Sequence, residues 1–358
     1  MELFGGIGAC TKALKNIEID VSVGDYVEID KYAVKSYNAI NNTNFEPQDI
    51  TKWNKDINID LIMHGSPCQD FSVAGKQAGG DEGSGTRSSL MYETIRIIEK
   101  LHPKYIIWEN VKNLLSKKHK HNFDNYINKL DKLGYNSYYQ ILDAQDYGIP
   151  QHRERVYTVS IRKDIDNNKF TFPEKIPLQL KLKDLLEDVV DDKYYLTEKG
   201  IGRLIKKNNK LIRNNNNPEV SSCCLNANKK VSVQDRIYDE EGIAATVTAS
   251  EFRPKIAERK MFNPYNDKEI KDIAPTQTAN CGCSTSSAAV LISEDGKNYL
   301  KIRKLTPLEC WRLMGFDDKD FYKAKNSGIS DSQLYKQAGN SIVVKVLEKI
   351  FLNLFKGD

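Results

Sequence analysis

The chain has 358 residues, of which 40% are hydrophobic and 28% are charged, the composition of a globular protein with a large core. No apolar run approaches the roughly 18 residues of a membrane span and no signal-peptide pattern opens the chain, so we expect a soluble, cytoplasmic protein. The net charge of +4 permits a nucleic-acid partner without requiring one, because phosphate contacts need only a local basic surface.

The first half of the chain alternates β-rich runs with helical patterns of apolar residues. Strands are predicted at 21–29, 60–65, 105–108, 138–142 and 156–161, and helices at 31–41, 88–101 and 123–133. This alternation is typical of an α/β fold with a doubly wound, mainly parallel sheet. Ligands of such sheets bind beyond the carboxyl ends of the strands, so polar residues that follow a strand are candidate site residues.

The second half of the chain has a different character. From about residue 173 the sequence is polar, Asn-rich and irregular, and two of its segments, 242–249 and 272–279, resemble each other. The tail, 333–355, ends in an apolar helix that needs the first-half sheet to bury it. We therefore expect one domain from 1–172 plus 330–358 and a second domain from 173–329.

The seven cysteines predict neither disulfides nor a metal site. Their number is odd and their spacing offers no pair of C-x-x-C half-sites for zinc, so we expect reduced thiols in an intracellular protein. These residues are Cys10, Cys68, Cys223, Cys224, Cys281, Cys283 and Cys310.

A glycine-rich turn near the N-terminus is a candidate nucleoside site. The run Phe4–Gly8 follows a short β-like start and precedes a helix, so its glycines allow a ligand to approach the backbone closely. Glu28 ends the next predicted strand, where an acidic side chain binds ribose hydroxyls in related sheets. Asp49 is placed to accept a hydrogen bond from an adenine amino group, but a solvated surface carboxylate is an equally good interpretation. A plain strand–helix turn is the alternative for the glycines.

Cys68 is a candidate nucleophile. It follows a predicted strand within Gly65–Gln69, and a turn at that position exposes sulfur to a cleft, where a nearby cation can lower the thiol pKa. Glu109 also ends a strand, and burial would raise its pKa enough for it to protonate a ring nitrogen. Arg153 and Arg155 alternate on an extended segment, where they would bind phosphate or polarise a carbonyl; each alone is more typical of a solvated charge.

Taken together, these motifs resemble those of C5-cytosine DNA methyltransferases of the prokaryotic and phage restriction-modification type. The resemblance follows the family's order from Phe4–Gly8 through Pro67–Gln69, Glu109–Val111 and Gln151–Arg155. It ends with the segment 303–316 (RKLTPLECWRLMGF) and the segment 337–341 (QAGNS).

The resemblance implies a Rossmann-like domain that binds S-adenosylmethionine, a smaller, irregular target-recognition domain, and no metal. It implies catalysis by Cys68, Glu109, Arg153 and Arg155 on a cytosine flipped out of double-stranded DNA. The residues implied to contact the cofactor are Phe4, Gly6, Gly8, Glu28, Ile29, Asp49, Ile50, Pro67, Leu90, Asn340 and Ser341. Those implied to contact DNA are Gln69, Ser72, Lys76, Gln77, Thr246, Val247, Thr276 and Arg303.

Several alternatives stay open at this stage. Thr246 and Thr276 both resemble the family's Thr-Leu recognition element, and we favour Thr246. The first motif reads FGGIG where the family usually has FAGIG, and because Gly5 replaces another small residue, we expect cofactor binding to survive. A tRNA cytosine-5 methyltransferase and an inactive DNA-binding homologue are the rival functions. The resemblance implies a monomer and allows a cognate restriction endonuclease that acts separately.

Overall fold

The computed structural model describes residues 1–68, 70–71, 79–195 and 299–356, and six short strands between 237 and 292. The chain divides into two compact units. The first comprises Met1–Ile149, Arg153–Leu178 and Trp311–Asp358, and the second comprises Pro150–His152 and Gln179–Cys310.

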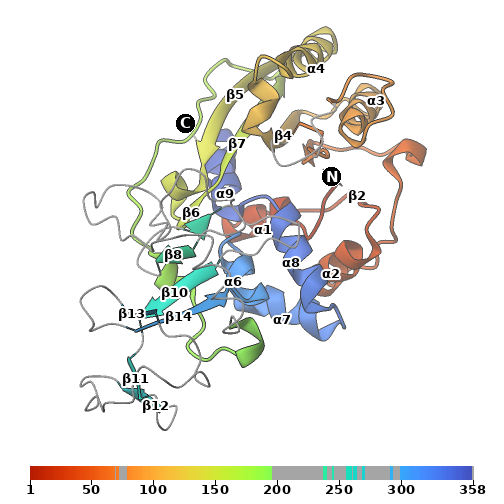
Figure 1. Ribbon diagram of the computed structural model, residues 1–358. Helices are drawn as coiled ribbons and strands as arrows, with labels where there is room; N and C mark the ends of the chain where they lie inside the picture. The colour runs from red at the N-terminus through yellow and green to blue at the C-terminus, as the bar shows by residue number, and fades with distance from the viewer. Residues whose placement is uncertain are drawn as a thin grey trace. The chain divides into compact units, whose positions relative to one another are not determined.

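The first unit is built on a six-stranded sheet (Figure 1). In the order β2-β1-β3-β4-β7-β5, its strands are β2 (Tyr26–Val27), β1 (Glu2–Leu3), β3 (Leu61–His64), β4 (Tyr105–Val111), β7 (Glu154–Arg162) and β5 (Tyr135–Asp143). The first four are parallel, whereas β7 runs antiparallel to both of its neighbours. The expected α/β fold is therefore confirmed, with one reversed strand in a mainly parallel sheet.

Helices cover both faces of this sheet. The first unit contains α1 (Ala9–Asn16), α2 (Lys31–Asn41), α3 (Met91–Leu101), α4 (Lys120–Lys132), α7 (Asp318–Asn326), α8 (Asp331–Asn340) and α9 (Val344–Phe355). Residues of α3 and α4 share an apolar core with Ile106 and Trp108 of β4. Tyr105, on the opposite face of β4, meets Phe355 of α9 with ring centroids 5.2 Å apart. The alternation along β4 thus places α9 on the face opposite α3 and α4.

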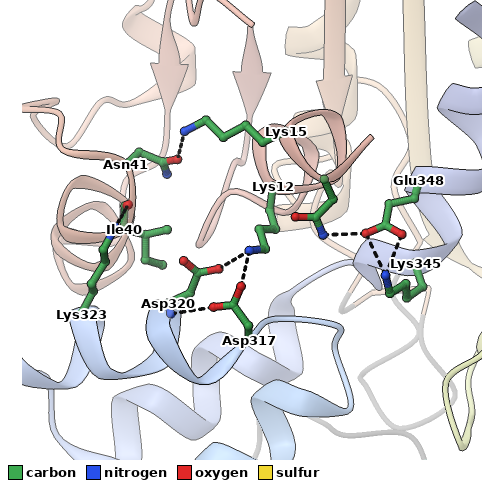
Figure 2. A network of polar contacts seen from close by, with 10 residues as sticks. Lys12, Lys15, Ile40, Asn41, Asp317, Asp320, Lys323, Lys345 and Glu348 are labelled. Carbon is green, nitrogen blue, oxygen red and sulfur yellow. Dashed lines mark hydrogen bonds and ion pairs between the residues drawn. The ribbon is translucent and has the colours of Figure 1, made fainter. Parts of the chain in front are cut away.

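The C-terminal helices attach to the first unit through ion pairs as well as apolar contacts. Figure 2 shows Lys12 of α1 between Asp317 and Asp320, at 2.6 and 2.8 Å. Lys323 Nζ of α7 donates to the carbonyl of Ile40 in α2 at 2.8 Å. These contacts explain why the first unit includes residues 311–329, so that its boundary lies earlier than the expected residue 330.

Two local expectations differ from the observed elements. The predicted strand at 21–29 contracts to Tyr26–Val27, because only these two residues pair with β1. The apolar C-terminal helix, predicted to include Ile342, begins only at Val344, so Ile342 lies in the turn between α8 and α9. Of the predicted apolar face, Val346 and Ile350 are fully buried in α9.

The described part of the second unit contains short strands, besides the 3-10 helices Leu182–Leu185 and Asp192–Tyr194. The strands are β6 (Gln151–His152), β8 (Ile237–Asp239), β9 (Ala244–Ala245), β10 (Lys255–Arg259), β11 (Met261–Asn263), β12 (Lys268–Ile270), β13 (Leu291–Ile292) and β14 (Tyr299–Lys304). A four-stranded sheet has the order β13-β14-β10-β8, while β11–β12 and β6–β9 form separate pairs. Helix α6 (Pro307–Arg312) crosses the boundary between the units. In the described residues, no helix has the length and apolarity needed to span a membrane.

Candidate active site

Two strand ends and one strand start meet at the same edge of the first-unit sheet. His64, the last residue of β3, pairs with Trp108, and Val111, the last residue of β4, pairs with Arg155 near the start of β7. Because β7 is antiparallel to β4, its first residues lie beside the end of β4. The reversal brings the segments that carry Cys68, Glu109 and the two arginines together, although they are up to 87 positions apart in the sequence.

The turn that carries Cys68 is fastened to β4 by buried polar groups. Trp108 Nε1 donates to Ser66 Oγ at 3.0 Å, and Asn110 Nδ2 lies 3.4 Å from both the Oγ and the carbonyl oxygen of Ser66. The carbonyl of Cys68 accepts from the backbone N–H of Phe71 at 3.0 Å. Cys68 itself is half-buried. The contacts of Ser66 and Asn110 were not foreseen, although both residues belong to the motifs that drew attention to this site.

Glu109 is buried and paired. Its Oε1 lies 3.1 Å from Nε of Arg155, a diagonal neighbour on the same face of the sheet. Burial raises the pKa of Glu109, and the positive charges of Arg155 and Arg153 only partly offset this effect. A methyl group at Gly65 would lie 3.7 Å from Oε2 of Glu109, so the Cys68 turn approaches the carboxyl group closely at this glycine.

Arg153 is also buried, and it binds the turn between α8 and α9. Its Nη2 donates to the carbonyl oxygens of Gly339 and Ser341 at 3.2 and 2.8 Å. Burial, with the charge of Arg155, lowers the pKa of Arg153 to about 9. Arg153 therefore connects two regions that the sequence had singled out separately, the start of β7 and the QAGNS segment.

The thiol pKa of Cys68 is set by opposing effects. Burial raises the pKa of the Cys68 thiol, and the negative charge of Glu109 raises it further. The positive charges of Arg155 and Arg153 act in the expected direction but do not outweigh these two effects. The two cations therefore lower the thiol pKa as expected, but burial and Glu109 leave it raised overall.

The glycine-rich turn and Glu28 form a second cluster. Glu28 Oε2 accepts from the backbone N–H of Gly6 at 3.1 Å, and Oε1 accepts from Asp30 N at 2.8 Å. Gly6 and Gly8 have φ values of 53° and 86°, which L side chains rarely adopt. A Cβ atom at Gly6 would have no atom within 4 Å, so this glycine faces open space. Burial raises the pKa of Glu28.

Asp49 is held near this cluster by the preceding residue, Gln48, which binds the backbone of Glu28. Gln48 N donates to the carbonyl of Glu28 at 2.8 Å. The Asp49 carboxylate caps the short helix Ile50–Lys52 by accepting from Thr51 N at 3.0 Å and from Thr51 Oγ1 at 2.8 Å. These hydrogen bonds lower the pKa of Asp49, so it is a carboxylate at neutral pH.

The remaining candidate cofactor residues occupy varied positions. Ile29 is 68% exposed and Ile50 belongs to the apolar core. Phe4 and Leu90 pack on that core while partly buried, and Phe4 adopts a φ of 54°. Pro67 precedes Cys68 in the turn. Asn340 and Ser341 end α8, with Asn340 exposed and Ser341 buried.

Arg303 is misassigned as a DNA contact. Its side chain is completely buried in the second unit, and Nη1 and Nη2 each donate to a carboxylate oxygen of Glu309 at 2.7 Å. A buried, bidentate ion pair leaves this guanidinium unable to reach a phosphate.

The other predicted DNA contacts lie outside the described residues: Gln69, Ser72, Lys76, Gln77, Thr246, Val247 and Thr276. No group of three or more metal-ligating side chains occurs among the residues that the structure describes.

Comparison with known proteins agrees with these motifs. The family model of C-5 cytosine-specific DNA methylases matches residues 1–356. The orphan methyltransferase M.SPBetaI of Bacillus phage SPbeta is 34% identical, over 99% of this chain and 96% of its own length. The type II methyltransferase M2.ScrFI of Lactococcus lactis subsp. cremoris is 38% identical, over 84% of this chain and 67% of its own.

A solved structure supports the fold. The methyltransferase EhMeth of Entamoeba histolytica superposes with a TM-score of 0.67 at 19% identity, covering 99% of this chain and 97% of its own. Since a family model matches nearly the whole chain, the protein belongs to the C-5 cytosine-specific DNA methylase family.

Proposed function

We propose that this enzyme transfers a methyl group from S-adenosylmethionine to C5 of a cytosine flipped out of a specific short sequence in double-stranded DNA. The observation that supports it most directly is the cluster of Cys68, Glu109 and Arg155 at one edge of the sheet. A nucleophile, a carboxyl group with a raised pKa and a guanidinium are the three groups that addition to a cytosine ring requires.

The glycine-rich turn suits the proposed cofactor. Gly6 faces open space, and Glu28 presents a carboxylate beside it for the ribose hydroxyls. Asp49 keeps its negative charge at neutral pH and would accept from the adenine amino group. When bound, S-adenosylmethionine supplies an electrophilic methyl group. The full set proposed to hold it remains the eleven residues that the resemblance implies.

The proposed chemistry begins at Cys68. Its proton leaves and Sγ bonds to C6 of the cytosine, which shifts the electrons of the C5–C6 double bond toward C5 and makes that carbon nucleophilic. Burial raises the pKa of Glu109, which favours the protonated form that would donate to N3, where negative charge develops during the addition. Bonding of C5 to the methyl group breaks the methyl–sulfonium bond and leaves S-adenosylhomocysteine. A general base then removes the C5 proton, the C5–C6 double bond re-forms as the Sγ–C6 electrons return to sulfur, and N3 gives its proton back to Glu109.

The two arginines have separate proposed roles. Arg155, which pairs with Glu109 in the free protein, would hold the O2 carbonyl of the base. Arg153 would keep the start of β7 and the turn at Gly339–Ser341 in place through its two backbone contacts. We further propose that the region 173–329 contains the sequence-reading domain, with Thr246 or Thr276 in its recognition element, and that the enzyme acts as a monomer.

A covalent trap tests the proposed mechanism. A DNA fragment of several kilobases, amplified with 5-fluorodeoxycytidine triphosphate, carries fluorine at C5 of every new cytosine and contains all short sequences. Fluorine at C5 cannot be removed as a proton can, so the final elimination is blocked. The protein should therefore stay bonded to the DNA through Cys68 when S-adenosylmethionine is present. Wild type should give an adduct on a denaturing gel, and Cys68→Ser should give none.

Two further outcomes decide between the alternatives. An adduct with a 5-fluorocytosine RNA transcript but not with the DNA would favour the tRNA methyltransferase. No adduct with either nucleic acid, from a folded protein that binds S-adenosylhomocysteine, would refute the covalent route.

A further inference from the structure

Two buried tyrosines lie directly behind the glycine-rich turn. Tyr26 of β2 and Tyr37 of α2 are fully buried and stack with ring centroids 3.9 Å apart at an interplanar angle of 21°. Phe45 packs against both rings, at 5.6 and 5.9 Å. The pair belongs to an apolar cluster separate from the main core. No motif in the sequence pointed to either tyrosine.

The tyrosine rings fill the space that side chains at two of the glycines would need. A Cβ atom at Gly5 would lie 2.6 and 2.8 Å from two ring carbons of Tyr26, and one at Gly8 would lie 2.6 Å from Tyr37. Gly8 also has a positive φ, whereas Gly5 does not. At Gly5, therefore, the main obstacle to alanine is the ring of Tyr26, with Glu2 Cβ next at 3.1 Å.

Tyr26 also holds the turn through its hydroxyl group. The phenolic O–H donates to the carbonyl oxygen of Gly6. Burial raises the pKa of Tyr26, and the nearby carboxylate of Glu28 raises it further, so the phenol stays protonated and remains a donor. The N–H of Gly6 meanwhile donates to Glu28. The peptide groups on both sides of Gly6 are thus held by the side chains of Tyr26 and Glu28, while its Cα faces open space.

We propose that Tyr26 is a positioning residue for S-adenosylmethionine, and that Gly5 and Tyr26 are a matched pair in which the ring takes the place of a methyl group at position 5. This inference rests on the proposed function of the glycine-rich turn. It accounts for the departure from the family's usual FAGIG: in this chain an alanine would collide with Tyr26. The role of Tyr26 is to fix the backbone of Gly6 in the conformation that faces the cofactor.

The hydroxyl group is tested with Tyr26→Phe, which keeps the stacked ring. The dissociation constant of S-adenosylhomocysteine, measured by calorimetry, should rise by about 3- to 10-fold, the value of one hydrogen bond. Tyr135→Phe is the matched control, because Tyr135 is equally buried and donates to the carbonyl of Pro103 at 2.7 Å, away from the turn. The control should bind S-adenosylhomocysteine as wild type does.

The matched pair is tested with a double-mutant cycle. Gly5→Ala alone should weaken S-adenosylhomocysteine binding by more than about 10-fold and lower the melting temperature, because the methyl group overlaps the Tyr26 ring. In a Tyr26→Ser background the same substitution should change binding by less than about 2-fold, since the space is then free. This rescue is a result that independent, merely destabilising substitutions would not produce.

Failure of the proposed cofactor site and failure of the roles proposed for Tyr26 give different results. Wild-type protein that does not bind S-adenosylhomocysteine would overturn the proposed cofactor site and the positioning role with it. Normal wild-type binding with an unaffected Tyr26→Phe variant would overturn the positioning role alone. Equal effects of Gly5→Ala in both backgrounds, on binding and on melting temperature, would refute the matched pair.

Discussion

At the scale of single residues, Cys68 has a thiol pKa set by opposing effects. Burial and the charge of Glu109 raise it, while Arg155 and Arg153 lower it. A raised pKa means that the thiol form predominates at neutral pH and that the thiolate fraction grows as pH rises toward the pKa.

The pH profile of Cys68 alkylation checks this balance. The rate of reaction with iodoacetamide, followed by mass spectrometry of the Cys68 peptide, should have its midpoint above that of an exposed cysteine. Arg155→Gln removes one of the lowering charges, so the midpoint should move to higher pH. Glu109→Gln removes a raising charge, so it should move to lower pH. Shifts in the opposite directions would contradict the assigned causes.

Much of the candidate site was predictable from motifs, whereas its electrostatics were not. Cys68, Glu109, Arg153 and Arg155 were named from their positions after or before strands, and the structure brings their segments to one edge of the sheet. The direction of the Cys68 pKa shift depends on burial and on the distance to Glu109, neither of which a sequence displays. Tyr26 was missed for a similar reason, because a tyrosine in a strand is ordinary until its contacts are known.

At the scale of elements, the reversed strand β7 is what assembles the site. A fully parallel sheet would place the start of the fifth strand at the edge opposite the end of β4, far from Glu109. The sequence predicted the strand but not its direction. It also predicted the C-terminal helix but not the chain reversal before it, where the end of α8 and Ser341 carry the carbonyl oxygens that Arg153 binds.

Arg303 illustrates how a motif residue serves an element rather than a ligand. Its neighbours Lys301 and Lys304 suggest a basic surface, yet Glu309, six residues later, neutralises it inside the second unit. The same carboxylate accepts from the backbone of Thr306 at 2.7 Å and of Glu187 at 2.9 Å. The ion pair therefore holds three segments of the second unit together.

Removing one partner of the Arg303–Glu309 pair should destabilise the fold. Arg303→Met leaves the carboxylate of Glu309 buried without its guanidinium, and we expect the free energy of unfolding to fall by about 3–5 kcal/mol. Arg303→Met with Glu309→Leu should recover most of that loss. The measurement is urea denaturation followed by circular dichroism. Arg312→Met is the control, because its partner Asp318 is 48% exposed and the loss should stay below about 1 kcal/mol. Equal losses for Arg303 and Arg312 would contradict this account.

At the scale of the whole molecule, the chain divides into two compact units. The first unit takes its last segment from Trp311 rather than from residue 330, because Lys12 and Ile40 bind α7. Charged pairs between distant segments carry no signal in composition or periodicity, which explains the difference. The apolar patterns of the helices did predict which segments would build the first unit.

The central claim is that Cys68 makes this protein a cytosine-5 methyltransferase of DNA. Bisulfite sequencing of DNA from cells that express the wild-type protein or Cys68→Ala tests it most directly. We predict protected cytosines at one short sequence in the wild-type sample and none in the mutant, with both proteins folded and bound to S-adenosylhomocysteine. Unprotected DNA in the wild-type sample, or equal protection in the mutant, would contradict the account.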